Sequence, residues 1–187
     1  MKKNKLFAVL CCFAALVCTS FLVSCGDDDD DKKFDPSAIY GSWKIYEVRE
    51  IDYDKNGKVL EDDTESFAVD NECYYILTFT DKTMQAENWY DVGDGHGNSK
   101  FEVSHTTIYD ITYSENSFMP NKIIKETIRE GFGSEGSRVG KKVDYSINGN
   151  TLTLTNEITE DAEEYTGVKG AAKAISIKTF KKVNEKK

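Results

Sequence analysis

The chain has 187 residues, and its 33 aspartates and glutamates outnumber its 24 lysines and arginines, so the formal net charge is −9. This length suits one domain with a short additional segment. The excess of acidic residues argues against a nucleic-acid-binding protein, because a phosphate backbone would repel such a surface. The low mean hydropathy excludes a protein that crosses a membrane many times.

The N-terminal residues predict export and lipid attachment. Residues 1–5 are mostly basic and residues 6–23 almost wholly apolar, as in a secretory signal. An apolar run of this length is also just long enough to cross a bilayer. However, Leu22-Val23-Ser24-Cys25 resembles a bacterial lipobox. The resemblance implies that residues 1–24 are a lipoprotein signal peptide that is removed. It also implies that Cys25 carries the acyl chains, such as palmitate, that anchor the protein in a membrane.

The cysteines are consistent with this interpretation. Removal of the signal would eliminate Cys11, Cys12 and Cys18, and Cys25 would carry lipid. Cys73 would then be the only thiol of the mature chain, so we expect no internal disulfide. Because residues 1–24 hold three lysines and no acidic residue, the mature chain of 163 residues would have a net charge of −12.

Residues 25–36 are expected to form a flexible tether. They include a run of five aspartates at positions 27–31, which cannot bury apolar surface and repel one another. An acidic run directly after the lipidated cysteine resembles the export signal of Bacteroidota-type surface lipoproteins. The resemblance implies a protein that is anchored in the bacterial outer membrane and exposed on the cell surface. A lipoprotein that faces the periplasm is the alternative.

Residues 37–187 predict an all-β domain, because short alternating segments are separated by turn residues. The expected strands cover residues 43–51, 58–61, 73–80, 83–90, 101–113, 143–147, 151–155 and 175–179. In the longest of them, Phe101, Val103, Tyr109 and Ile111 recur at odd positions and should share one buried face. Residues 120–130 favour a strand over a short helix, and residues 161–173 a loop or a helical turn. Eight or nine strands with short links fit one closed barrel or a β-sandwich.

The start of the first strand favours the barrel. Tyr40-Gly41-Ser42-Trp43-Lys44 resembles the Gly-x-Trp signature of the lipocalins, and residues 143–154 look like the closing hairpin of lipocalin-like bacterial lipoproteins. The resemblance covers residues 37–183 and implies an antiparallel lipocalin-like barrel of eight to ten strands. In that family the tryptophan packs across the closed end, and the glycine permits a close approach of the backbone. The family's late arginine, which covers the tryptophan, is missing, and Lys178 or Lys181 would take its place.

A lipocalin-like barrel is expected to bind a small apolar ligand in its interior. The side chains expected to face inward and contact that ligand are Trp43, Tyr75, Phe79, Tyr109, Ile111, Tyr145 and Leu154. The alternative is a filled barrel that serves as an interaction or adhesion module. Its loops at residues 91–100 and 131–140 would then contact a partner protein or a glycan. We expect a monomer in either case.

A partial calcium motif occurs at the first turn. Asp52, Asp54 and Asn56 alternate as oxygen ligands do in a calcium loop, and Gly57 follows them. Asp63 stands where that motif has a bidentate glutamate, and the flanking segments look like strands rather than helices. Aspartate, asparagine and glycine are also the usual residues of a hairpin turn, which is the favoured interpretation.

Catalytic chemistry has little support in the sequence. The two histidines, His96 and His105, show no spacing that would bring them together with Cys73. His96 falls in a glycine-rich loop, and His105 falls on the apolar face of a strand. We therefore expect a protein that is not an enzyme and that uses no cofactor.

Overall fold

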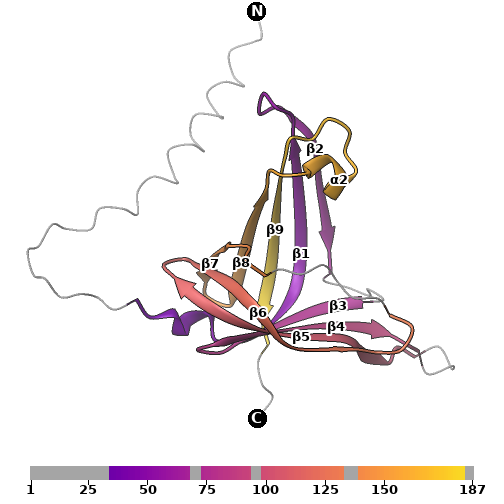
Figure 1. Cartoon of the computed structure of the whole chain (residues 1–187). Helices are drawn as coiled ribbons and strands as arrows, with labels where there is room; N and C mark the ends of the chain where they lie inside the picture. Colours follow the sequence, from indigo (N-terminus) through magenta and orange to yellow (C-terminus); the bar gives the residue numbers. More distant parts are fainter. Residues whose placement is uncertain (1–33, 68–72, 94–97, 133–138, 184–187) are drawn as a thin grey trace, which may run out of the picture. The chain divides into compact units, whose positions relative to one another are not determined.

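A computed structural model describes residues 34–67, 73–93, 98–132 and 139–183 (Figure 1). The elements in these residues are η1 (Pro36–Ile39), β1 (Gly41–Tyr53), β2 (Val59–Ser66), β3 (Cys73–Phe79), β4 (Thr83–Asp91), β5 (Phe101–Ser114), β6 (Ser117–Ile128), β7 (Val143–Asn148), β8 (Thr151–Ile158), α2 (Ala162–Thr166) and β9 (Lys173–Lys182). The expected signal peptide, Cys25, the five aspartates and His96 lie outside the described residues. No helix in the described ranges has the length and apolar character needed to cross a membrane.

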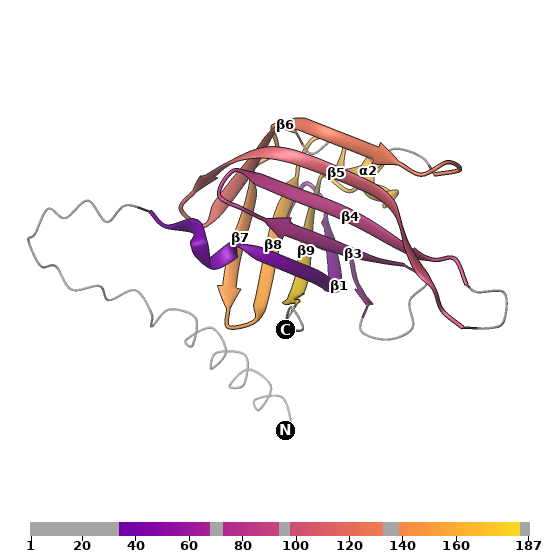
Figure 2. The same ribbon diagram turned by 90° about the horizontal axis from the view of Figure 1, so that it is seen from below.

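The strands form one antiparallel sheet in the order β2-β1-β3-β4-β5-β6-β7-β8-β9. Residues 43–53 of β1 also pair with β9, and this pairing closes eight strands into a barrel. Strand β2 is the extra strand and pairs with β1 alone (Figure 1). In Figure 2, β3, β4, β5 and β6 follow one another in sheet order, as do β7, β8 and β9. The closed arrangement confirms the lipocalin-like barrel and excludes the β-sandwich. Residues 120–130 are confirmed as a strand, since they lie largely within β6.

A β-bulge in β5 changes which residues face the interior. Asn88 of β4 pairs with His105 and Trp89 pairs with Val103, so Ser104 is an extra residue. One extra residue turns the following side chains to the opposite face of the sheet. The prediction that Phe101 and Val103 share a face with the rest of β5 is therefore wrong.

The hydrophobic core fills one end of the barrel, around Trp43. Trp43 and Phe180 have no exposed surface, and Phe79 packs edge-on against Phe118 with ring centroids 5.2 Å apart. The Trp43 indole Nε1 donates a 2.7 Å hydrogen bond to the carbonyl of Ile39, the last residue of η1. The turn η1 is thus tied to the closed end of the barrel, where the lipocalin resemblance placed the tryptophan.

Lys182 covers the Trp43 ring, with its Nζ 4.9 Å from the ring centroid. The expectation that Lys178 or Lys181 would do so is therefore wrong. Gly41 adopts a φ of +107°, a conformation that strains any residue with a Cβ. An added Cβ would lie 3.6 Å from Cε of Lys182, which is ordinary van der Waals contact. The backbone conformation, rather than a close approach, explains the glycine.

Candidate functional site

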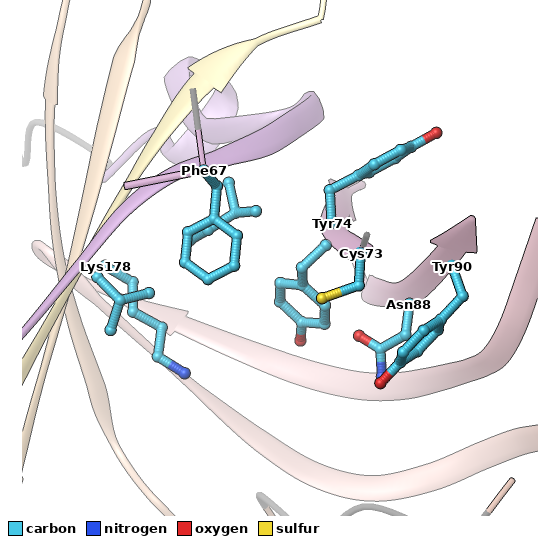
Figure 3. A pocket seen from close by; sticks show the side chains of 9 residues that line it. Phe67, Cys73, Tyr74, Asn88, Tyr90 and Lys178 are labelled. Carbon is cyan, nitrogen blue, oxygen red and sulfur yellow. The ribbon is translucent and has the colours of Figure 1, made fainter. Parts of the chain in front are cut away.

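Strand β1 exchanges one neighbour for another along its length. Residues 41–44 pair with β3, whereas residues 47–53 pair with β2. Residues 73–75 of β3 consequently have β4 as their only partner among the described strands. A cavity of about 210 Å³ lies at this opening in the wall (Figure 3). The residues that line it are Ile45, Val48, Phe67, Cys73, Tyr74, Tyr75, Asn88, Tyr90 and Lys178.

A bulge in β1 places two of the apolar lining residues. Ile45 pairs with Phe180 and Glu47 pairs with Thr179, so Tyr46 is an extra residue relative to β9. Ile45 therefore faces the interior, and Val48 does so three residues later rather than two or four. Regular alternation would have turned Val48 to the outer face.

The paired strands β3 and β4 supply the opposite wall. Cys73 pairs directly with Tyr90, and Tyr75 pairs with Asn88. Directly opposed residues of an antiparallel pair point to the same face, so these four side chains gather on one side. Figure 3 shows Cys73 and Asn88 turned toward the cavity, whereas the Tyr74 ring points away from it. Cys73 forms no disulfide within the described residues.

Among the described lining residues, Lys178 is the only charged one. It lies on β9 between Val48 of β1 and Leu154 of β8. Its side chain is among those that line the cavity (Figure 3). The cavity therefore combines aliphatic and aromatic walls with one ammonium group, which can hold an acidic group of a bound molecule.

A polar strip continues from the cavity across the interior face of β5. His105 is 5% exposed and is the direct partner of Asn88. Its Nε2 lies 2.9 Å from Thr107 Oγ1 and 3.1 Å from Glu126 Oε1, and its buried Nδ1 has no hydrogen-bond partner in the described part of the chain. The sequence pattern predicts that His105 lies on the apolar face of its strand. In the structure it is buried on the inner face and is hydrogen-bonded there.

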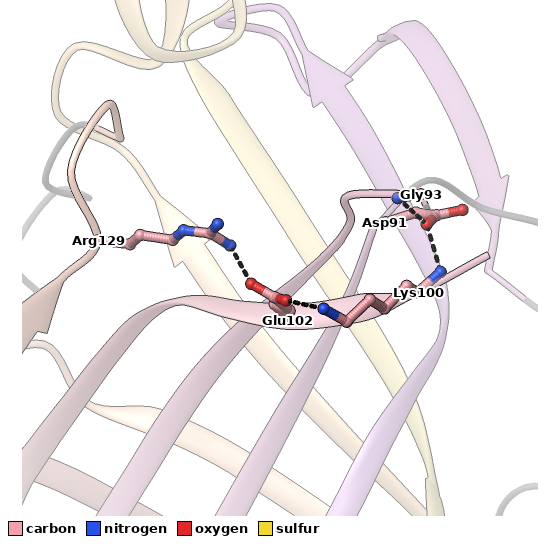
Figure 4. A network of polar contacts seen from close by, with 5 residues as sticks. All are labelled: Asp91, Gly93, Lys100, Glu102 and Arg129. Carbon is pink, nitrogen blue, oxygen red and sulfur yellow. Dashed lines mark hydrogen bonds and ion pairs between the residues drawn. The ribbon is translucent and has the colours of Figure 1, made fainter. Parts of the chain in front are cut away.

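Ionic contacts hold the β4–β5 loop beside the cavity (Figure 4). Glu102, the direct partner of Tyr90, accepts hydrogen bonds from Lys100 at 2.7 Å and from Arg129 at 2.6 Å. Lys100, and then Arg129, hold the pKa of the Glu102 carboxyl below its usual value. Asp91 Oδ1 also accepts two backbone N–H bonds across the base of the loop, at 2.8 and 2.7 Å. These contacts fix the ends of the loop and the end of β6 relative to one another.

The structure brings one of the seven expected ligand contacts to the cavity, namely Tyr75. The residues that lie in the buried core instead are Trp43, Phe79, Tyr109, Ile111 and Leu154, and Tyr145 packs against that core. Alternation from Trp43 points to Ile45 as an inward residue. No sequence pattern predicts that Val48 and Lys178 line the cavity, because their positions depend on the β1 bulge and on the pairing of β1 with β9.

The residues of the partial calcium motif serve separate structural roles. Asp54 Oδ1 accepts hydrogen bonds from the backbone N–H groups of Asn56 at 2.8 Å and Lys58 at 2.9 Å. The bond from Lys58, and then that from Asn56, hold the pKa of the Asp54 carboxyl below its usual value. Asp52 lies on the barrel wall, paired with Glu61 and Ala174. The described ranges contain no group of three or more histidine, cysteine or acidic residues placed to hold a metal ion.

Neither protein-family models nor curated proteins nor solved structures gave a match to this chain.

Proposed function

We propose that the protein is a membrane-anchored lipoprotein whose barrel binds a small, largely apolar ligand with one acidic end. The observation that carries this proposal is the cavity of about 210 Å³ where β1 leaves β3. Lipocalin-like barrels enclose about one small ligand, so the architecture supports this role.

The volume of the cavity sets the size of the part of a ligand that it can enclose. Its volume exceeds the roughly 150 Å³ that accommodates a benzene molecule in an engineered protein cavity. It falls below the roughly 300 Å³ at the lower end of pockets for drug-sized ligands. A compound of one or two rings, or an aliphatic chain of similar volume, fits between these limits.

The chemistry of the walls specifies the two ends of the ligand. Ile45, Val48 and Phe67 offer only apolar surface, and contact with them removes apolar ligand surface from water. Lys178 supplies a positive charge, and Asn88 supplies an amide that can donate or accept. A carboxylate near the ammonium of Lys178 would gain a charge-assisted hydrogen bond.

The sequence features at the N-terminus support the membrane anchor. The lipobox ending at Cys25 and the acidic run after it place the domain, on this proposal, on the outer face of a bacterial outer membrane. Two or more acyl chains hold a protein at a membrane far more firmly than one chain does. Mass spectrometry of the N-terminal peptide tests the lipid, and protease treatment of intact cells tests surface exposure.

The ligand proposal is tested with the full chain purified in detergent. We expect 2-naphthoate, an aromatic acid, to bind more tightly than the neutral 2-naphthamide. Lys178→Met keeps a long unbranched side chain but removes the charge. It should weaken naphthoate binding about tenfold and naphthamide binding less than about twofold. Equal losses for the two probes would show that Lys178 does not recognise an acidic group.

A second variant tests the position of the site. Val48→Phe places a larger side chain in the cavity and should weaken both probes at least about tenfold, because the cavity has no spare volume for both rings. Val183→Phe makes the same change at an exposed position outside the cavity and is the matched control. Unchanged binding by Val48→Phe would exclude this cavity as the site. Mass spectrometry of compounds extracted from the purified protein then identifies the natural ligand.

A further inference from the structure

Strand β2 presents an unpaired edge. It pairs with β1 over residues 47–53 and ends the sheet, because no described strand pairs with its other side. All eight of its residues are exposed. The N–H and C=O groups along the outer edge from Val59 to Glu65 are therefore available to an added strand.

The inner face of the β1–β2 pair is acidic. Asp52 pairs with Glu61, Glu50 pairs with Asp63, and Val48 pairs with Glu65. Directly paired residues share a face, and Val48 lines the cavity, so these five carboxylates lie on the inner side of the wall. A hydrogen bond with Asp63 and its charge raise the pKa of the Glu61 carboxyl, and the charge of Asp52 adds to this effect. Negative charge is thus crowded on this face.

Two buried polar groups on the same face have unused hydrogen-bonding capacity. Asp52 is 3% exposed and Ser176 is 4% exposed. Within the described residues, neither Asp52 Oδ1 nor Ser176 Oγ has a hydrogen-bond partner. Ser176 is the β9 partner of Glu50, which places its hydroxyl on the inner side beside the acidic residues. A buried acceptor without a donor is costly, so Asp52 favours a donor that reaches across β2, whereas β1 and β2 separate Ser176 from a strand added there.

Cations of the protein neutralise the opposite face instead. Arg49 forms a two-pronged contact with Asp62, at 2.8 and 2.6 Å, and both residues are directed outward. None of the ion pairs between described residues involves Glu50, Asp52 or the inward-facing acids of β2. The inner face is therefore predominantly acidic among the described residues, with Lys178, the β9 partner of Val48, as a cation on the same face.

We propose that β2 docks an extended segment of a partner protein that carries lysine or arginine at alternate positions. Such a segment would add as a further strand along residues 59–65. Because side chains alternate across a strand, every second residue of the segment would face Glu61, Asp63 and Glu65. Their carboxylates match a row of ammonium or guanidinium groups.

The same charges disfavour pairing with a second copy of this chain. Two β2 strands side by side would bring like charges into direct opposition, which destabilises an antiparallel pair. Charged edge strands commonly protect proteins against such pairing. The acidic edge is thus selective for a basic strand. A dimer of this chain through β2 would contradict this selectivity.

The test compares two peptides of equal composition with the full chain in detergent. One alternates lysine and threonine, and the other has three lysines followed by three threonines. We expect the alternating peptide to bind at least about fivefold more tightly, because only its lysines all face the acidic side. An added strand would pair with β2 through the N–H groups of alternate residues. N-methylation of those amides should abolish binding, whereas N-methylation of the amides between them should not. Equal binding of the two peptides, or equal effects of the two methylations, would overturn the proposal.

Variants on the two faces of β2 provide the matched control. Asp63→Asn removes one inward charge and should weaken the alternating peptide at least about fivefold. Asp62→Asn removes charge from the outward face of the same strand and should change affinity no more than about twofold. Similar losses in both variants would show that only the net charge attracts the peptide. Formation of a dimer through β2, detected by light scattering and abolished by the peptide, would also contradict the proposal.

Discussion

The closed end of the barrel offers a sharp test of how the fold is held together. Trp43 has no exposed surface, and its Nε1 donates to the Ile39 carbonyl at 2.7 Å. Trp43→Phe keeps an aromatic ring but removes the N–H and part of the ring system. Trp89→Phe makes the same chemical change on the outer face of the sheet. There the Trp89 ring stacks on Tyr74, with centroids 5.7 Å apart.

The expected losses of stability differ because the two indole groups differ in their partners. Removal of the Trp43 N–H leaves the carbonyl of the fully buried Ile39 without its donor, which costs about 1–3 kcal/mol. The smaller ring also leaves a space, at about 1–2 kcal/mol. Trp43→Phe should therefore cost about 2–5 kcal/mol. The Trp89 Nε1 has no acceptor in the described part of the chain, so Trp89→Phe should cost less than about 1 kcal/mol.

The free energy of unfolding is best measured by urea titration with far-ultraviolet circular dichroism. Fluorescence is unsuitable because the chain has 2 tryptophans and each variant removes one. The slope of the unfolding free energy with urea should stay constant, so that a shift of the midpoint reports stability. Equal losses for the two variants, or a loss below about 1 kcal/mol for Trp43→Phe, would refute the assigned role of the Trp43 hydrogen bond.

Three further predictions concern single positions. Gly41→Ala should cost about 1–2 kcal/mol in urea unfolding, because alanine is strained at a φ of +107°; an unchanged midpoint would contradict this. Glu102, whose pKa Lys100 lowers, should stabilise the fold above its usual pKa of 4.5 and lose this contribution as the pH falls through the lowered value. The melting temperature of Glu102→Gln should thus be lower than that of the native chain at pH 7, and equal to it near about pH 2; a constant difference would argue against the ion pair. Asp54→Ala should accelerate hydrogen exchange at the two turn amides that bond its carboxylate, whereas unchanged exchange would assign those amides other acceptors.

Much of the fold was open to prediction because its signals are local. Alternation and turn residues located β1, β3, β4, β7 and β8 to within a few residues. The Asn-Gly pair at the first turn predicted the β1–β2 hairpin, in which Gly57 has a φ of +78°. The length of β2 was harder to predict from the sequence, because its eight exposed residues show no alternation of burial.

The residues that line the cavity were much harder to predict from the sequence. Alternation predicted inward residues such as Phe79 and Leu154, but it does not distinguish a residue in a packed core from one beside a cavity. That difference depends on where β1 parts from β3, which is set by pairings between distant segments. Bulges at Tyr46 and Ser104 add one residue each and reverse the expected faces.

The sequence by itself determined the all-β class and the tryptophan at the start of the barrel, and export with anchoring at Cys25 is a prediction from the sequence. These features are written in contiguous residues, so short-range chemistry suffices to predict them. Only the tertiary structure decided that the sheet closes through β1 and β9, that Lys182 covers Trp43 and that Lys178 enters the cavity. Each of these depends on strand register, and a shift of one residue moves every side chain of a strand to the other face.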